Sequence, residues 1–333
     1  MPIKQFQLVM KILSFIATYL TLTLAGILSA QSWNVEPGWL KLPKGQPKLG
    51  SMHGDIAVSS ANEIYVSLSI PKAGLQVYND SGNWLRNIEN APTDLHGFVI
   101  RKQGNEEFIY GARLGANQVV KLDLNGKEIL SIPNTAIPEQ FKRKDKNGKL
   151  YTRLTGVDVD KSGDIYVTDG YSSDYIHKFD SKGKYKTTFG GKSAPYKFRT
   201  LHKLIIDSRF SPSRVLGLDR ANNRIVHLSL AGKFIGVVAE GLKLPAGAHI
   251  HKDWLLVGEL KGSVSVLNKK GEIVATVGVN SNPAQAGKNG VHPSDWKNGV
   301  VTAPHGISSN QNGDIFVAEW NAHGRVHRFN LKN

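Results

Sequence analysis

The 333-residue sequence contains no cysteine, which excludes disulfide bonds and leaves packing to stabilise the fold. It has few long apolar stripes of helical period, and no apolar run after residue 28 is long enough to span a membrane. The motifs H-E-x-x-H and G-x-S-x-G are both absent. These absences argue against a helical fold, against metalloproteases that use the first motif and against α/β-hydrolases that use the second.

What the sequence does contain is typical of a β-rich protein. Hydrophobic residues make up 40% of the chain, enough for a large core, and 34 glycines suggest many tight turns. The net charge is +15, and many lysines gather in short turn motifs such as residues 124–128, 181–185 and 268–272. We interpret these lysines as solubilising ends of β-hairpins.

The first 30 residues have the pattern of a signal peptide. Lys4 and Lys11 precede an apolar stretch over residues 12–28, and two small residues follow it. We predict cleavage before Gln31, which leaves residues 31–333 with a net charge of +13 in a secreted or periplasmic protein. An uncleaved membrane anchor and a start at Met10 stay open as alternatives. After cleavage we expect no stable membrane span, and an exported basic protein rarely meets nucleic acid, so we expect no such partner.

An internal repeat predicts the architecture. Residues 154–190 and 201–239 both show four short apolar runs separated by turns rich in Gly, Asp and Asn. The second run recurs six times along the chain, as EIYVS, FIYGA, DIYVTD, RVLGLD, WLLVGE and DIFVAE. Four strands per unit, at spacings of 43 to 59 residues, predict an all-β fold, a six-bladed β-propeller without a second domain. The last unit lacks a fourth strand, so we expect residues 33–43 to supply it and close the ring.

The units between residues 154 and 190 resemble the NHL repeat, and this resemblance implies a six-bladed propeller of NHL type. Aligning the six units places one position at the start of each first strand, which is occupied by His53, His96, Thr155, His202, Ala246 and His305 in order. First strands line the central channel of a propeller, and alternate blades lie about 120° apart around its axis. We therefore expect His96, His202 and His305 to converge.

Three imidazoles that leave one coordination position open are typical of a catalytic zinc site. The alternative is that polar residues simply line a wet channel. His53 occupies the same aligned position in blade 1, where it could donate a hydrogen bond to a metal ligand or contact a substrate. His177, His227 and His327 recur on third strands, away from the axis, and we interpret them as structural.

Two loops between second and third strands belong to the same rim as these histidines. They are DGYSSD (169–174) and LDRANNR (218–224), and they carry Tyr171 and Arg220. A tyrosine beside a metal and an arginine can act as a base, and the arginine can hold a carboxylate. The alternatives are a packing tyrosine and an ordinary Asp-anchored turn.

Together these five residues resemble the peptidyl-α-hydroxyglycine α-amidating lyases. The resemblance implies zinc on His96, His202 and His305, a catalytic Tyr171 and an assisting Arg220. That family cleaves a carbinolamide and releases a peptide amide and glyoxylate.

The chain also departs from the family pattern. The second family arginine corresponds to Leu68, for which Arg113 is our candidate replacement in substrate binding. An acidic residue linked to a structural calcium corresponds to Gly306, so calcium binding stays open. The disulfides of the family are absent as well.

The sequence therefore predicts an exported, zinc-dependent lyase that acts as a monomer on a small-molecule or peptide-derived substrate. Two alternatives remain: a non-catalytic propeller that binds a polymer or protein on its rim, and a metal-dependent lactonase or other hydrolase. Two long insertions, residues 133–153 and 280–301, are expected to wall the site.

Overall fold

The computed structural model describes residues 31–332, so the predicted signal peptide lies outside the described residues. The regular structure of these residues is β, apart from four single-turn 3-10 helices. No helix in residues 31–332 has the length and hydropathy needed to cross a membrane.

Six antiparallel four-stranded sheets form the six blades, as predicted. Blade 1 contains β2 (Ile56–Val58), β3 (Ile64–Ser67), β4 (Leu75–Tyr78) and β5 (Trp84–Ile88). Blade 2 contains β6 (Leu95–Gln103), β7 (Glu106–Arg113), β8 (Gln118–Asp123) and β9 (Glu128–Pro133). Blade 3 contains β12 (Gly156–Val159), β13 (Ile165–Thr168), β14 (Tyr175–Phe179) and β15 (Tyr185–Gly190).

Blade 4 contains β16 (Leu201–Asp207), β17 (Arg214–Asp219), β18 (Arg224–Ser229) and β19 (Phe234–Ala239). Blade 5 contains β20 (Pro245–His251), β21 (Trp254–Glu259), β22 (Ser263–Leu267) and β23 (Ile273–Val277). Blade 6 contains β24 (Pro304–Ser309), β25 (Ile315–Glu319) and β26 (Val326–Leu331). Its fourth strand is β1 (Trp33–Val35), which pairs antiparallel with β26 and closes the ring as predicted.

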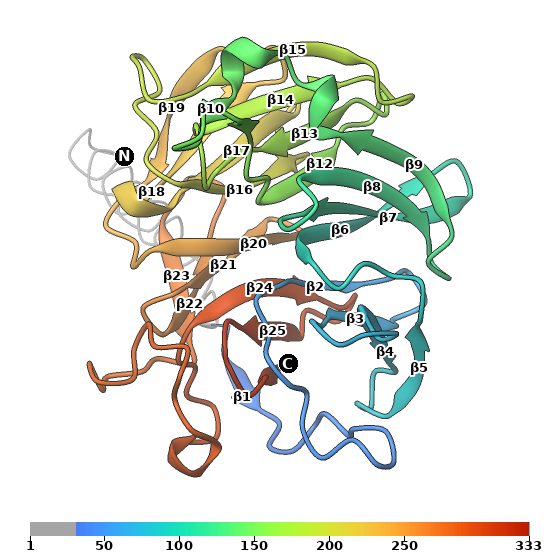
Figure 1. Cartoon of the computed structure of the whole chain (residues 1–333). Coiled ribbons are helices and arrows are strands. Elements are labelled where there is room, and N and C mark those ends of the chain that lie inside the picture. Colours follow the sequence, from blue (N-terminus) through green and yellow to red (C-terminus); the bar gives the residue numbers. More distant parts are fainter. Residues whose placement is uncertain (1–30, 333) are drawn as a thin grey trace, which may run out of the picture. The chain divides into compact units, whose positions relative to one another are not determined.

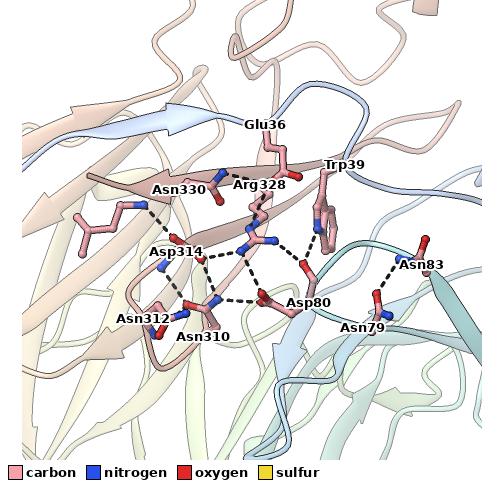
Figure 2. A network of polar contacts seen from close by, with 11 residues as sticks. Glu36, Trp39, Asn79, Asp80, Asn83, Asn310, Asn312, Asp314, Arg328 and Asn330 are labelled. Carbon is pink, nitrogen blue, oxygen red and sulfur yellow. Dashed lines mark hydrogen bonds and ion pairs between the residues drawn. The ribbon is translucent and has the colours of Figure 1, made fainter. Parts of the chain in front are cut away.

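The closure is reinforced by a polar network around Arg328 (Figure 2). The guanidinium of Arg328 donates to Asp314 at 2.8 Å within blade 6 and to Asp80 of blade 1 at 3.2 Å. It also lies 3.5 Å from Glu36 in the N-terminal segment, and Trp39 Nε1 donates to the Asp80 carbonyl at 2.9 Å. Figure 1 shows the blue strand β2 beside the red strand β24 at this junction. The guanidinium of Arg328 thus links blade 6 both to blade 1 and to the N-terminal segment.

Short polar motifs make the turns between strands. In the β8–β9 turn, Asp123 Oδ1 accepts from the amides of Asn125 and Lys127, both at 2.9 Å. Gly126 has a φ of +86°, a conformation that a side chain disfavours. The lysine-rich turns join third to fourth strands, so they lie at the end of the blades opposite to the N-termini of the first strands. We call these two ends the lower face and the upper face.

The hydrophobic core is divided among the junctions between neighbouring blades. One cluster, for example, joins Leu75 and Val77 of blade 1 to Phe98 and Ile109 of blade 2. Five further clusters fill the remaining five junctions in the same way. Because the blades are held radially by apolar contacts, the channel at the axis is free to contain polar side chains.

Candidate functional site

The register of the inner strands shows which residues are equivalent at the top of the channel. Gly97 pairs with Ala112, and Gly156 pairs with Thr168, so the preceding residues His96 and Thr155 are equivalent. In blade 1 the amide of Ser67 donates to the carbonyl of Asp55, and Ile56 pairs with Val66. Asp55 therefore corresponds to Gly97 and Gly156, and the residue before it, Gly54, corresponds to His96 and Thr155. The alignment that put His53 in this position is therefore wrong by one residue, because blade 1 carries glycine there.

The six equivalent positions thus alternate between histidine and a residue without an imidazole. In ring order they are Gly54, His96, Thr155, His202, Ala246 and His305. Each histidine uses Nδ1 to bond the backbone carbonyl of the next position: His96 to Thr155 at 2.7 Å, His202 to Ala246 at 2.8 Å and His305 to Gly54 at 2.8 Å. Because a carbonyl only accepts, Nδ1 carries the proton, and the Nε2 lone pair is left for another partner.

The three rings converge at the axis. Their centroids are 4.7 to 4.9 Å apart, and their planes are steeply inclined to one another. All three side chains are buried, and burial together with the charges of neighbouring groups lowers the pKa of His96, His202 and His305 well below its ordinary value. The imidazoles are therefore neutral, which is the form that binds a metal.

His53 lies on the open side of this group as a fourth imidazole. Its centroid is 4.8 Å from that of His96 and 4.9 Å from that of His305. The candidate ligand atoms of His53, His96 and His305 lie within 4.8 Å of one another. Burial, followed by the charges of Arg220 and Arg153, lowers the pKa of His53 to about 4. The ligand atoms of His53, His96 and His305 are thus close enough for a metal ion, whereas His96, His202 and His305 are the three whose rings are oriented by carbonyls of the next blade.

Tyr171 reaches the same point from the upper loop of blade 3. Its hydroxyl lies 3.0 Å from His202 Nε2, 3.2 Å from His96 Nε2 and 3.5 Å from His53 Nε2. Arg220 donates from Nη1 to this hydroxyl at 3.2 Å, and its guanidinium lies 5.1 Å from the centre of the tyrosine ring. The structure thus brings the two predicted loop residues to the histidines.

The surroundings of His305 Nε2 indicate whether these residues fit a metal ion. The atom is buried and has no hydrogen-bond partner among the described residues. An unpartnered buried nitrogen is costly, whereas a neutral imidazole whose Nδ1 proton is held by a carbonyl is the usual form of a histidine ligand. The residues present therefore fit a zinc ion.

A buried ion pair closes the channel directly below the histidines. Lys203, which follows His202, bonds through Nζ to Asp55, which follows Gly54, from the opposite side of the ring. The equivalent residues of the other four blades are all glycine. A Cβ on Gly306 would lie 2.6 Å from Asp55 Oδ1, so an acidic residue cannot replace this glycine while Asp55 keeps its position. Asp55, the carboxylate beside Gly306, is paired with the ammonium group of Lys203.

Two neighbouring cavities lie at the upper face, and they meet the site at its histidines and at Tyr171, respectively. One of about 280 Å³ is lined by His53, His96, Leu114 and Arg153, and another of about 800 Å³ is lined by Tyr171, Leu114, Arg153 and residues of the first insertion. That insertion contains β10 (Arg143–Lys144) and β11 (Leu150–Tyr151), a small hairpin, and it walls the site as predicted. The second insertion, residues 280–301, lines neither of these cavities and packs against the N-terminal segment instead.

Arg113, the predicted substrate contact, is engaged within its own blade. In blades 3 to 6 an acidic residue ends the second strand or directly follows it. Each accepts a backbone amide from the segment leading into the first strand, as Asp169 accepts from Arg153 at 2.6 Å. Arg113 takes this position in blade 2, where it donates to Asp94 at 2.8 Å. It lines neither cavity, and Leu68, its counterpart in blade 1, is buried.

Arg153 is the residue that sequence reasoning missed. Its side chain is exposed, lines both cavities and has no hydrogen bond or ion pair with other described residues. No pattern in the sequence marks this role, because the position of Arg153 depends on how the first insertion returns to blade 3. Within residues 31–332, Arg153 is thus a cation without a side-chain partner in cavities that also contain His53, His96 and Tyr171.

The histidines interpreted as structural lie within their blades. His227 Nε2 bonds Asp207 at 3.0 Å, His327 Nε2 bonds Glu319 at 2.5 Å, and His177 Nδ1 bonds Thr188 at 2.9 Å. His227 lies one residue out of register with the other two, because it pairs with Leu216 rather than with the following residue.

No family model matches the chain. Among solved structures, a structural genomics protein of unknown function from Bacteroides thetaiotaomicron is similar, with a TM-score of 0.59 and 13% identity, over 91% of this chain and 76% of that one. Virginiamycin B lyase from Staphylococcus aureus is similar with a TM-score of 0.55 and 14% identity, over 85% of this chain and 96% of that one. At these identities the likeness is one of fold, and this protein is a six-bladed β-propeller with a histidine-lined channel.

Proposed function

We propose that this propeller is an exported zinc-dependent lyase that cleaves a carbinolamide, in the manner of the amidating lyases that it resembles. The observation that supports this best is the ring of three neutral imidazoles, each with Nδ1 on the carbonyl of the next blade. Tyr171 and Arg220 beside the ring supply the other groups that such a cleavage needs. One structural neighbour is also named a lyase, which agrees with the proposal at the level of fold.

Zinc is held by Nε2 of His96, His202 and His305 in this proposal, because only these three imidazoles are oriented by a backbone carbonyl. Zinc, when bound, supplies Lewis-acid polarisation of a substrate oxygen. His53, without such a carbonyl, contacts the substrate. We also infer that the repeats are of NHL type and that the first 30 residues direct export to the periplasm or the medium.

The chain's own residues then handle the proton and the carboxylate. Tyr171, as a phenolate stabilised by Arg220, takes the proton of the substrate hydroxyl and becomes a neutral phenol. The carbon–nitrogen bond breaks, its carbon becomes the aldehyde of glyoxylate, and the amide nitrogen receives a proton from Tyr171. Arg153, at the mouth of the site, holds the substrate carboxylate.

The direct test is to supply an N-acyl-α-hydroxyglycine to the zinc-loaded protein and to measure glyoxylate release. We expect turnover by the wild type and a loss of roughly 10²–10⁴-fold in Tyr171→Phe, as for a lost general base, with the zinc content unchanged. A compound that stays inert while zinc is fully bound would overturn the lyase assignment and direct screening to esters and lactones.

Metal analysis tests the ligand set separately. His202→Ala should lose stoichiometric zinc, whereas His53→Ala should keep it. Zinc loss in His53→Ala with retention in His202→Ala would assign the metal to the other set, His53, His96 and His305. No stoichiometric metal in the wild type would leave a propeller that binds a polymer or protein on its rim.

A further inference from the structure

A polar cavity on the lower face lies at the end of the channel opposite to the histidine site. It has a volume of about 590 Å³ and is lined by residues 101–104 of blade 2, residues 159–163 of blade 3, and the ends of the inner strands β16 and β20. These segments come from four consecutive blades, and all lie at the C-terminal ends of first strands or in the turns beside them. We call this cavity the lower pocket.

The lower pocket is separate from the site above. The buried Lys203–Asp55 pair crosses the channel just below the histidines. Between that pair and the lower pocket, a small cavity bounded by Lys203, Arg101 and His249 has a volume of only about 20 Å³. Such a space holds about one water molecule, so a ligand in the lower pocket cannot contact the upper site.

An ion pair with Asp158 fixes the guanidinium of Arg101 in the lining of the lower pocket. Its Nε and Nη2 donate to the fully buried carboxylate of Asp158 at 2.7 and 2.8 Å, and Nη1 donates to the Ile100 carbonyl at 3.1 Å. Each terminal nitrogen carries a second hydrogen, so the held guanidinium can still donate twice. Lys102 and Lys161 line the same pocket and are exposed.

The carboxylate of Asp160, which also lines the pocket, accepts hydrogen bonds from its own blade. Asp160 Oδ1 accepts from the amide and hydroxyl of Ser162 at 2.9 and 2.6 Å, and Oδ2 accepts from the Tyr166 hydroxyl at 2.9 Å. Its oxygens are thus occupied within its own turn. Arg101, Lys102 and Lys161 thus outnumber the two nearby carboxylates, Asp158 and Asp160, and the two exposed lysines have no ion-pair partner among the described residues.

His249 and two serines add neutral hydrogen-bonding groups. The side chains of His249, Ser208 and Ser213 have no hydrogen bond within residues 31–332, and all three residues line the pocket. Burial, followed by the charges of Arg101 and Lys203, lowers the pKa of His249 to about 3, so its ring is neutral and offers one donor and one acceptor. Such groups suit the hydroxyl groups of a ligand rather than its charge.

We propose that the lower pocket binds a small hydroxylated organic anion, with its phosphate or carboxylate group on Arg101 and the two lysines. The hydroxyl groups of the ligand face His249, Ser208 and Ser213. Sugar phosphates and sugar acids share this chemistry. The proposal is independent of the lyase activity, because the two sites share no residue.

Calorimetric titration of the full chain with glucose 6-phosphate, gluconate and glucose tests the proposal at 150 mM salt, where weak surface attraction is screened. We expect saturable one-site binding of at least one of the two anions, and no binding of glucose. The anion that binds more tightly decides between a phosphate and a carboxylate. Absence of saturable binding by both anions would overturn the proposal.

Substitutions inside and outside the lower pocket show where the anion binds. Lys102→Gln with Lys161→Gln should weaken binding at least tenfold, whereas Lys233→Gln with Lys270→Gln removes the same charge from lower-face turns outside the pocket and should leave binding unchanged. His249→Leu, which changes no charge at neutral pH, should also weaken it. Equal losses of affinity in the pocket and control variants would mean that net charge accounts for the binding, and would overturn the proposal. Loss of binding in His202→Ala, made and titrated without metal, would move the ligand to the upper site and overturn the proposal.

Discussion

The histidines around the channel differ in how their rings are held, and this difference decides what each can do. A carbonyl of the next blade orients His96, His202 and His305, whereas no backbone carbonyl bonds His53 among the described residues. His53 instead lies against Tyr171 and Trp320, with ring centroids 6.3 and 5.3 Å away. An oriented imidazole suits a metal ion, and a less constrained one can adjust to a substrate.

The two arginines near the site allow a matched test of substrate recognition. Arg153→Gln removes the free cation that lines both upper cavities, so we expect the KM of a carboxylate substrate to rise roughly 10–100-fold, since a charged hydrogen bond contributes about 1.5–3 kcal/mol. Arg113→Gln breaks the pair with Asp94 outside the cavities and should leave KM unchanged. The zinc content should be normal in both.

A methyl ester of the same substrate is the control, because it lacks the charge that Arg153 binds. Its KM should be the same for the wild type and Arg153→Gln. If instead Arg113→Gln raises KM and Arg153→Gln does not, the substrate contact belongs to Arg113, as the sequence first predicted.

Among the individual residues of the site, those that recur at one position of the repeat were predictable. His96, His202 and His305 occupy one position of a repeat, so their convergence followed from the ring. His53 was misplaced because a short first strand and a glycine shift the alignment of blade 1 by one residue. The Lys203–Asp55 pair joins residues 148 positions apart across the channel, and no local pattern marks such a contact.

At the scale of the element, an acidic residue at the end of a second strand holds the segment that leads into the first strand of its blade. Glu319 at the end of β25 accepts from the amides of Thr302 and Ala303 at 2.9 and 3.0 Å, and from Arg325 and His327. These bonds place the segment just ahead of His305. The same arrangement with Asp169 precedes blade 3, and with Asp219 it precedes His202.

The charge of Glu319 should make stability depend on pH. Burial alone would raise the pKa of Glu319, but the bonds from His327, the charge of Arg325 and the bond from Thr302 outweigh it and lower the pKa from 4.5 to about 2. A lowered pKa means that the stabilisation is fully present above pH 4.5 and is lost as the pH falls toward 2. The difference corresponds to about 3 kcal/mol.

Urea denaturation of the wild type and Glu319→Gln between pH 7 and pH 3 measures this contribution. We expect Glu319→Gln to be less stable at pH 7, and the difference between the two proteins to shrink below pH 4.5. A difference that stays constant down to pH 3 would mean that the carboxylate is not charged in the folded protein.

The Lys203–Asp55 pair links blades 1 and 4 beneath the histidines, and a double-mutant cycle tests it. Both side chains are buried, so Asp55→Asn or Lys203→Met alone leaves one group without its partner and should cost about 3–5 kcal/mol of unfolding free energy. The double variant should cost less than the sum of the two. Additive losses, measured by urea denaturation, would contradict a direct pair.

At the scale of the whole molecule, the number of blades and their order around the ring were predictable, because the repeat specifies each blade separately. The position of the second insertion was not, because the repeat says nothing about loops between blades, and residues 293–299 of that loop pack beside the N-terminal segment. Ring closure was predictable from a missing strand, but its polar reinforcement was not. That network joins Glu36, Asp80 and Asp314 to Arg328, from three distant parts of the chain.

Arg328 should therefore matter to the stability of the entire propeller. Its side chain is largely buried, and Arg328→Met would leave Asp314 without its ion-pair partner and remove the bond to Asp80 of blade 1. We expect a loss of about 3–5 kcal/mol, the range for one partner removed from a buried pair, in a single cooperative transition. Arg86→Met is the control, because Arg86 and Glu63 form a partly exposed pair within blade 1, which should contribute about 1 kcal/mol or less. Similar losses in the two variants would show that closing the ring does not depend on Arg328, and that β1 and the apolar contacts of the blade 6–blade 1 junction suffice to hold the two ends together.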